Sequence, residues 1–563
     1  LRPKIIEPDR RVAFPEDKHI EAYQFLAIEV ESGQITKADY RPCPVVYPPY
    51  SGYFTGHRGW WDTDSRHAYF IDQERGGKVL NLVRLDTHTG HTQILIQETS
   101  DFAITQIPIS HIHTLLMPLQ ETNELIWFSE RSGWAHLYLY DMSNGELKNP
   151  ITQGDWLVRN VLHFDAERRE LLIQTAGRKR DYNPYYCDIC RVNIDSGELI
   201  TILSSDHEYV VCDQRSRITV RDPKAAGISP SGRYLVTTRS RVDEVPVSLL
   251  LSCEELSENS DESGAVGLAK ECLTLEIANV SGLPKHWQWP EPVMLKAADG
   301  ETDIDGVIFR PTDFDPEKSY PILDCSYGYV GAIGSFSNNS TGNMHYLSPA
   351  AYAELGFIVV CINNRGNDGL RNTAFSAYQS PDFPLDPLLL RKYHKADCIA
   401  GIKQLAERHP YIDLNRVGIV EFGSIPMALA GMLVHPDFYK VGVSINAMAD
   451  SRMVGSLGMY EKNYPQLESF ANNLRGKLLI ITGMLDWAIP AAMTFRLVEA
   501  LKNSNKRFDM LVLPNLTHGT TGYTIQRSWD YVVEHLLNVV PPENIQITTS
   551  MDGLIDLGVQ SES

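Results

Sequence analysis

The sequence predicts two folded units of different class, an all-β region of the propeller type followed by an α/β region built on a parallel sheet. Two observations carry this prediction. Short runs with alternating apolar residues, separated by turn residues, fill the chain from about residue 14 to residue 251. After about residue 320, continuous apolar runs alternate with amphipathic stretches of helical period, which is typical of parallel strands covered by helices on both faces.

The turns of the β region follow a repeated pattern. The stretches LYLYDMSNGELKNPIT and CRVNIDSGELITIL each indicate a strand, an acidic turn with glycine and a second strand, and WDTDS…LDTHTGHT is a looser copy. Their spacing of roughly 50 residues is typical of propeller blades. We therefore expect residues 1–285 to form propeller blades, with the acidic, Ser/Gly-rich stretch 254–267 as a solvated loop.

The α/β region is expected to span residues 286–541, and residues 542–563, which have no strong pattern, are expected to be a loose tail. It begins with further strands within 289–311. The parallel strands are predicted at 321–331, 358–366, 416–423, 441–447, 477–483 and 509–514, and the helices at 350–357, 397–410, 425–436, 491–504 and 528–540.

Composition excludes several functional classes. The 51 basic and 71 acidic residues give a net charge of −20, which disfavours a nucleic-acid backbone or an anionic membrane as partner. No run of 18 uncharged apolar residues is present, so the sequence predicts no membrane span. Of the nine cysteines only Cys187 and Cys190 are closely spaced, and the pair is expected to lie in a strand rather than in a zinc site. No phosphate loop, metal cluster or dinucleotide fingerprint appears, so no cofactor is implied.

Two polar residues follow successive predicted strands near the end of the chain. Asp486 comes just after the strand at 477–483, and His518 just after the strand at 509–514. Active residues of a parallel α/β sheet lie on such loops. An acid and then a histidine at these places matches the chain order Ser…Asp…His of an α/β-hydrolase, in which the acid orients the imidazole and the imidazole takes the nucleophile's proton.

The nucleophile of such a triad is expected on the turn after the strand at 416–423. A nucleophile elbow needs small residues two positions before and after the nucleophile, because the turn is tight. With Gly423 at the nucleophile position the flanks are Glu421 and Ile425, and with Ser424 they are Phe422 and Pro426. Neither arrangement satisfies the rule. The first also lacks a nucleophilic side chain.

Several motifs along the chain are long and specific: WFSERSGWAHLYLYD, ITQGDWLVRNV, GISPSGRYLVTTRSRVDEVP, KAADGETDIDGVIFRPTDFDPEKSYPILD, INNRGNDG, YIDLNRVGIV, GMLDWAIP and THG. In these motifs the chain resembles the prolyl oligopeptidase family, in its dipeptidyl-peptidase branch. The resemblance covers nearly the whole chain and includes the 32-residue separation of Asp486 and His518. It implies a β-propeller, partial in this chain and made of its C-terminal blades, followed by an α/β-hydrolase domain, with a cavity between them that admits peptides.

The departures from the family pattern fall on its catalytic positions. The motif G-x-S-x-G-G aligns with residues 421–426, so Gly423 occupies the serine position and Glu421 the first glycine. The tyrosine of the oxyanion hole fits Tyr327 only with a one-residue shift, which makes Ser326, Tyr327 and Ser424 the candidate oxyanion region. The resemblance places the substrate pocket at Ser451, Val454, Trp487, Ala488 and Ile489. Within it, Ser451, Val454 and Gly458 stand where the family has Trp and Tyr, and Ala488 stands where it has a carbonyl-holding Asn.

These observations leave three hypotheses about function. The favoured one is a repurposed enzyme that binds a peptide or peptide-like small molecule and uses Asp486 and His518 for acid–base steps without a serine nucleophile. The second is an inactive pseudopeptidase that acts by binding, and the third is an active serine exopeptidase that uses Ser424. Glu421 is expected either to join the acid–base pair or to serve a helix terminus or solvent.

The resemblance also bears on partners. The stretch AFPEDKHIEAYQFLAIEVESG resembles a blade well inside the family's propeller, so the family's upstream blades have no counterpart in this chain. An open half-propeller exposes strand edges, which proteins avoid. We expect a second polypeptide, a cleaved N-terminal fragment or an oligomeric partner to supply the rest of the propeller.

Overall fold

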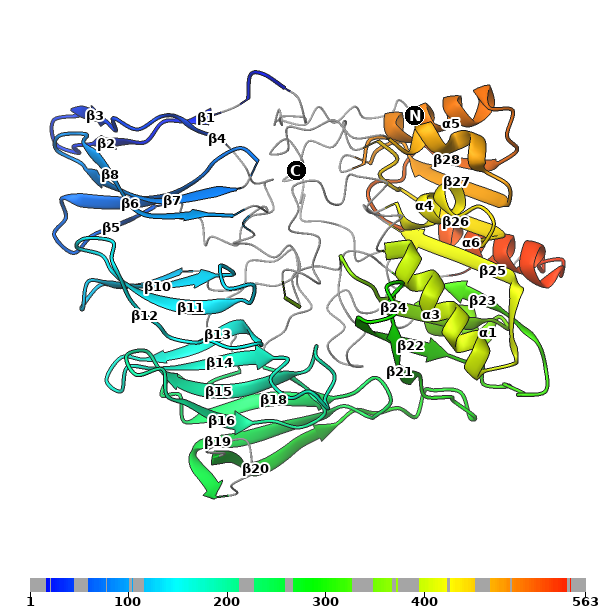
Figure 1. Cartoon of the computed structure of the whole chain (residues 1–563), viewed down its shortest axis with the longest axis horizontal. Helices are drawn as coiled ribbons and strands as arrows, with labels where there is room; N and C mark the ends of the chain where they lie inside the picture. The colour runs from blue at the N-terminus through cyan, green and yellow to red at the C-terminus, as the bar shows by residue number, and fades with distance from the viewer. Residues whose placement is uncertain are drawn as a thin grey trace, which may run out of the picture.

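A computed structural model describes two units side by side, a series of antiparallel sheets and a mixed sheet flanked by helices (Figure 1). This is the fold class that the sequence predicts. The structure describes residues 17–20, 22–44, 59–76, 78–100, 104, 116–211, 227–258, 267–326, 348–366, 371–372, 394–422, 426–450, 466–486, 489–543 and 547.

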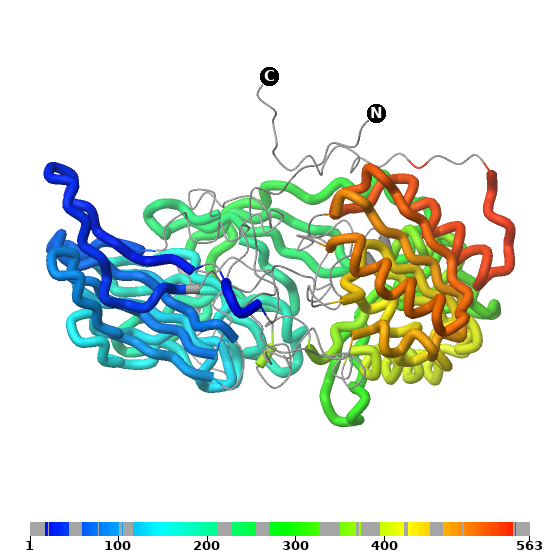
Figure 2. Tube along the Cα trace, turned by 90° about the horizontal axis from the view of Figure 1, so that it is seen from above, coloured from blue at the N-terminus to red at the C-terminus, as the bar shows by residue number. Residues whose placement is uncertain are grey.

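The first unit contains, in its described part, four antiparallel sheets of four strands, each a meander in chain order. Two short strand pairs precede them, β1 (Ala22–Tyr23) with β4 (Cys43–Pro44) and β2 (Leu26–Ile28) with β3 (Ile35–Lys37); Figure 2 shows β2 and β3, in dark blue, projecting beyond the sheets. The four sheets are β5 (Gly59–Trp61), β6 (His67–Gln73), β7 (Val79–Asp86) and β8 (Thr92–Thr99); β9 (Leu116–Leu119), β10 (Glu124–Ser129), β11 (His136–Asp141) and β12 (Leu147–Pro150); β13 (Leu157–Asp165), β14 (Glu170–Ala176), β15 (Cys187–Asn193) and β16 (Leu199–Leu203); and β17 (Glu208–Val210), β18 (Tyr234–Ser240), β19 (Val247–Glu258) and β20 (Gly267–Ile277).

The repeated sequence pattern corresponds to one repeated turn between the third and fourth strands of a sheet. In the turn from β11 to β12, the carboxylate of Asp141 accepts the Ser143 N–H at 2.7 Å, and the Gly145 N–H donates to the Asp141 carbonyl at 2.8 Å. Gly145 adopts a φ of +78°, which favours glycine. Gly90 and Gly197 adopt the same left-handed conformation in the turns after β7 and β15.

Apolar side chains fill the space between neighbouring sheets. Leu82 and Trp127 belong to a cluster between the first and second sheets, and Leu137 and Ile173 to one between the second and third. Ile189 and Leu235 lie in a third cluster, between the third and fourth sheets. Each of the inner sheets is therefore buried on both faces, as propeller blades are. Cys187 and Cys190 lie in β15 as expected, and both are buried.

The second unit is built on an eight-stranded sheet in the order β21-β22-β24-β23-β25-β26-β27-β28. One predicted feature of this sheet needs correction. The sheet is not wholly parallel, because β21 pairs antiparallel with β22 and β22 antiparallel with β24. Its strands are β21 (Glu291–Lys296), β22 (Asp303–Phe309), β23 (Tyr320–Asp324), β24 (Ile358–Asn363), β25 (Ile412–Phe422), β26 (Val441–Ile445), β27 (Lys477–Gly483) and β28 (Asp509–Leu513).

Helices flank this sheet, and apolar clusters occupy both of its faces. The last helix starts at Gly522, six residues before the predicted start, because Thr521 and Thr524 form a capping box there. The helical segments are α1 (Ser348–Glu354), α3 (His394–Arg408), α4 (Met427–Val434), η6 (Leu467–Asn473), α5 (Ala491–Asn503), α6 (Gly522–Val532) and η7 (Val533–Leu537). None of the helices described is long and apolar enough to cross a membrane.

The prediction of a loop over residues 254–267 is wrong at both ends. Strand β19 continues to Glu258, and β20 begins at Gly267, with Glu258 paired to Gly267. Backbone pairing between the two neighbouring strands therefore extends through residues that their charge assigned to a loop. Residues 259–266 lie outside the described part of the chain.

The two units are in direct contact. Val242, from the loop between β18 and β19, is 1% exposed and lies in an apolar cluster of the second unit with Val307 and Phe309. The guanidinium of Arg371 lies 5.7 Å from the ring centre of Tyr185, which precedes β15, and 3.7 Å from the carboxylate of Asp305 on β22. Both apolar packing and a charged group therefore join propeller to sheet.

Candidate active site

Asp486 and His518 lie on the loops that follow β27 and β28, two parallel neighbours in the sheet. The Nδ1 atom of His518 lies 2.9 Å from the Oδ2 atom of Asp486. The Asp486 side chain is fully buried, whereas that of His518 is 24% exposed. The two residues predicted from the chain order are thus in hydrogen-bond contact at the carboxyl ends of their strands.

The partners of Asp486 orient the pair. Its second oxygen, Oδ1, accepts the backbone N–H of Ile489 at 2.8 Å. Because an ionised carboxylate only accepts hydrogen bonds, its contact with His518 requires the proton on Nδ1 of the imidazole. This tautomer leaves Nε2 as the basic nitrogen, as in the acid–histidine pairs of hydrolases. Ile489, predicted as a pocket residue, is buried and holds the acid through its backbone.

The two loops are joined directly through their backbones. The Met484 N–H donates to the Leu513 carbonyl, and the Leu485 N–H donates to the Leu516 carbonyl, both at 3.0 Å. A Cβ at Gly483 would lie 2.3 Å from the Leu516 carbonyl oxygen, closer than real Cβ contacts. Glycine at the end of β27 therefore allows the acid loop to approach the histidine loop closely enough for the pair to form.

Glu421 lies at the end of β25 and is 4% exposed. Its carboxylate accepts the backbone N–H of Ala428 in the first turn of α4 and the hydroxyl of Ser444 on β26, the latter at 2.9 Å. A helix start has N–H groups without partners inside the helix, and a carboxylate there satisfies them. Of the two roles expected for Glu421, this geometry matches the helix terminus.

Burial raises the pKa of Glu421 to about 8, although the Ala428 N–H and the Ser444 hydroxyl both favour its ionised form. Lys395, which also favours the ionised form, belongs to a buried polar group next to it. The ammonium of Lys395 lies 3.1 Å from the carboxylate of Asp324, which also accepts the Tyr439 hydroxyl at 2.7 Å. Buried ionisable groups thus lie at the carboxyl ends of β23 and β25, on the same edge of the sheet as the Asp486–His518 pair.

The sequence matches two families in consecutive regions. Residues 40–246 match "Dipeptidyl peptidase IV (DPP IV) N-terminal region" and residues 343–538 match "Prolyl oligopeptidase family". The chain belongs to the prolyl oligopeptidase family, in its dipeptidyl-peptidase IV-like branch.

Relatives within this family include human dipeptidyl peptidase 8, 23% identical over 79% of this chain and 50% of the relative, and a probable dipeptidyl peptidase 4 of Aspergillus flavus, 26% identical over 64% and 41%. The chain spans about half the length of the curated relatives it matches. Solved structures with a similar fold include a putative dipeptidyl aminopeptidase IV of Bacteroides ovatus, which is 22% identical with a TM-score of 0.67 over 92% of this chain and 74% of the other. Another is dipeptidyl peptidase 4 of Porphyromonas gingivalis, which is 19% identical with a TM-score of 0.69 over 94% of this chain and 71% of the other.

Ser326, which was predicted in the oxyanion region, is buried and hydrogen-bonds to β24. Its N–H donates to Asp324 and its hydroxyl accepts the Ile362 N–H, both at 2.9 Å. The structure thus gives Ser326 a role in holding strand ends together. The other predicted site residues lie outside the described part of the chain: Gly423, Ser424, Tyr327, Ser451, Val454, Trp487 and Ala488.

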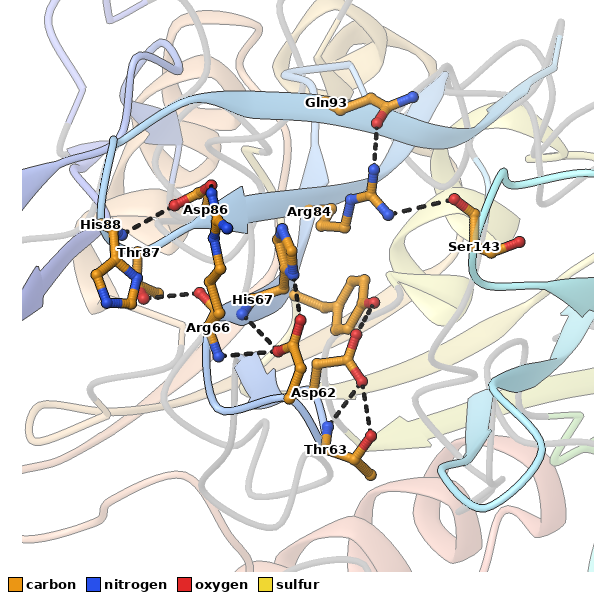
Figure 3. A network of polar contacts seen from close by, with 12 residues as sticks. Asp62, Thr63, Arg66, His67, Arg84, Asp86, Thr87, His88, Gln93 and Ser143 are labelled. Atoms are coloured by element: carbon orange, nitrogen blue, oxygen red, sulfur yellow. Dashed lines mark hydrogen bonds and ion pairs between the residues drawn. The ribbon is translucent and has the colours of Figure 1, made fainter.

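A separate group of ionisable side chains, Asp62, Asp64 and His67, lies on the turn between β5 and β6 (Figure 3). Asp62 accepts the Thr63 N–H and the Tyr69 hydroxyl, and Asp64 accepts the backbone N–H groups of Arg66 and His67. These carboxylates therefore serve as acceptors for donors of their own turn and of the start of β6.

Sequence reasoning missed Asn446, Asp324 and Lys395. Asn446 was open to the same argument as Asp486, because it is a polar residue directly after an apolar parallel strand. Asp324 also ends an apolar strand, β23. Lys395 gives no such signal, since it lies two residues before the helix predicted at 397–410, where a lysine is ordinarily assigned to solvent.

Proposed function

We propose that this chain is a dipeptidyl-peptidase-like protein that binds a peptide or peptide-like small molecule between its two units and performs non-hydrolytic acid–base chemistry. The observation that carries the proposal is the 2.9 Å contact between the buried Asp486 carboxylate and the His518 imidazole, in a chain that has Gly423 at the aligned serine position. General acid–base catalysis needs a positioned imidazole and no covalent intermediate.

His518 takes and returns the proton in this proposal. Asp486 keeps the proton of the resting imidazole on Nδ1, so Nε2 accepts a proton from the bound molecule, and the carboxylate then stabilises the imidazolium. Cyclisation or isomerisation of a bound peptide requires such a transfer in each direction. The partial exposure of His518 is compatible with access for a ligand, while the buried Asp486 stays out of contact with it.

Glu421 argues against an ordinary serine peptidase that uses Ser424. In a hydrolase of this fold, backbone N–H groups near the start of the helix after the nucleophile stabilise the oxyanion. At the start of α4 the Ala428 N–H already donates to the Glu421 carboxylate. This N–H group is therefore already occupied by the Glu421 carboxyl group and does not donate to an oxyanion.

The same contact favours a second candidate function, an inactive pseudopeptidase that acts by binding. Such a protein retains Asp486 and His518 because their contact, with the backbone hydrogen bonds beside it, holds two loops together. The two candidates differ in one respect: only the first requires turnover that depends on His518.

Two experiments separate these readings. Peptide mixtures incubated with the protein are analysed by mass spectrometry for products of unchanged mass or of lost water or ammonia. We expect His518→Ala to lower the rate of such turnover by about 10²–10⁴-fold. Turnover that survives the substitution contradicts the acid–base proposal, and a protein without any turnover supports the pseudopeptidase. A fluorophosphonate adduct mapped to Ser424 would instead establish the serine exopeptidase.

The partner proposal concerns the open face of the last sheet. Val236, Leu250 and Leu273 are cross-strand neighbours on that face, and Val236 and Leu273 are 41% and 55% exposed. The opposite face of the same sheet packs against its neighbour. In this proposal the propeller unit spans residues 1–285, the α/β-hydrolase unit spans 286–541, and residues 542–563 form a tail. A second polypeptide, a cleaved fragment or another copy of the chain packs on the open face and completes the propeller. Native mass spectrometry of protein purified from its source that finds only the mass of a single chain would contradict it.

A further inference from the structure

Asn446 occupies a conformation that few side chains adopt. It directly follows β26, and its φ of +49° lies in the left-handed region, where asparagine is enriched among non-glycine residues. Its N–H still donates to the Ile481 carbonyl on β27 at 2.9 Å. The chain therefore leaves the sheet at Asn446 while the residue stays attached to the strand that leads to Asp486.

The side chain of Asn446 contacts both loops of the acid–histidine pair. Its Oδ1 atom accepts the Gly483 N–H at 2.8 Å, at the start of the Asp486 loop. Its Nδ2 atom donates to the carbonyls of Thr517 and Gly519, at 3.3 and 3.1 Å, the residues on either side of His518. One buried amide, 1% exposed, thus bridges the backbone before the acid and around the base.

The chemistry of the amide is specific to this place. Gly483 offers a donor, whereas Thr517 and Gly519 offer acceptors, so the bridging side chain must accept on one side and donate on the other. Asparagine does both with one short, rigid group. Aspartate lacks the donors, and an aliphatic side chain lacks both functions.

We propose that Asn446 is the positioning residue of the Asp486–His518 pair, fixing the rotation and separation of the two loops so that Nδ1 of His518 meets Asp486. The loops are also joined by the backbone hydrogen bonds of Met484 and Leu485, so the fold does not depend on Asn446 alone. Asn446 therefore acts mainly on the alignment of the pair. What the aligned pair does rests on the proposed function, but its alignment does not.

The test uses the whole chain with ¹⁵N-labelled histidine. The Nδ1–H proton of His518, assigned by its loss in His518→Ala, is followed by NMR for its chemical shift and its exchange with water. Asn446→Gly removes the amide without straining a positive φ, and Asn446→Asp keeps the acceptor but removes the donors. We expect exchange at least ~10-fold faster in both variants, with the resonance shifted upfield as the contact with Asp486 weakens.

Asn364→Gly is the matched control. Asn364 is a buried asparagine after β24 whose amide contacts the Arg365 carbonyl and His394 instead of the pair. An unchanged His518 resonance in both Asn446 variants overturns the proposal, and so does an equal change in Asn364→Gly. If Asn446→Gly does not fold, Asn446→Asp decides alone. Failure of the proposed function gives a different result. The His518 resonance still changes in the Asn446 variants, but His518→Ala leaves the turnover rate unchanged.

Discussion

The carboxyl group of Glu421 is buried and accepts hydrogen bonds from the start of α4 and from the Ser444 hydroxyl. Removal from water favours its neutral form, whereas the Ala428 N–H and the Ser444 hydroxyl favour the ionised form. The balance is on the side of the neutral form, with a folded-state pKa of about 8 against an ordinary value of 4.5. The group therefore titrates in the range where enzymes are usually assayed.

This shift makes stability depend on pH. Between pH 4.5 and about 8 the folded protein binds up to one more proton at Glu421 than the unfolded chain does, so the free energy of unfolding falls as pH rises. Glu421→Gln removes this titrating group. We therefore expect the free energy of unfolding of the variant to fall less steeply with pH, by up to about 1.4 kcal/mol per pH unit. Urea unfolding of both proteins at pH 5, 6, 7 and 8 measures the difference. Parallel curves would show that Glu421 is ionised in the fold throughout.

At the scale of elements, glycines mark where one sheet of the propeller approaches the next. A Cβ at Gly145 would lie 2.1 Å from the Leu95 carbonyl on β8 of the preceding sheet, and one at Gly90 would lie 2.2 Å from the Lys37 carbonyl on β3. The turn glycine thus serves two purposes. It permits a positive φ, and it lets the neighbouring backbone come close.

Gly145 and Gly177 separate these two purposes. Both have a φ of +78°, but a Cβ at Gly177 meets no heavy atom within 4 Å. We expect Gly177→Ala to cost about 1–2 kcal/mol, the strain of the left-handed conformation alone. Gly145→Ala should cost at least about 1 kcal/mol more, because the turn must also move away from β8. Thermal unfolding of the two variants gives the comparison, and equal losses would show that the sheets separate freely at this turn.

These elements also show what sequence can predict. The turn around Asp141 and Gly145 was predictable because its hydrogen bonds are local, and Asp486 and His518 because they follow apolar strands. The antiparallel edge at β21 and β22 was not, because strand direction depends on pairing with distant segments. Likewise nothing in the sequence shows that the amide of Asn446 reaches Gly483, 37 residues along the chain.

The whole molecule is held together across its two units. Val242 belongs to the propeller by sequence and to the apolar cluster of the hydrolase sheet by packing. Arg371 connects the ring of Tyr185 to Asp305, and burial raises the pKa of this carboxyl group to about 6. Unfolding of one unit therefore exposes a part of the other.

We expect this coupling to be visible in calorimetry. Val242→Ala removes two buried methyl groups and should lower the free energy of unfolding by about 1.5–3 kcal/mol. Because the loss falls at the junction, the variant should also unfold over a broader range, with the two units separating into distinct transitions. Val30→Ala, at a side chain that is 95% exposed, is the control. A Val242→Ala profile that shifts without broadening would mean that the coupling between the units does not depend on this contact.

The contact between Glu421 and α4 also bears on the number of substitutions by which a serine peptidase site could be built at position 423 of this chain. A serine introduced at position 423 would stand two residues after a buried carboxyl group that already holds the first-turn N–H of Ala428. The second change must therefore remove Glu421, and Ser444 would then lose the acceptor of its hydroxyl. Because a buried hydroxyl without an acceptor is costly, the second substitution calls for a third one at Ser444. Building such a site therefore takes at least three linked replacements, and we expect the first one alone to bring no peptidase activity.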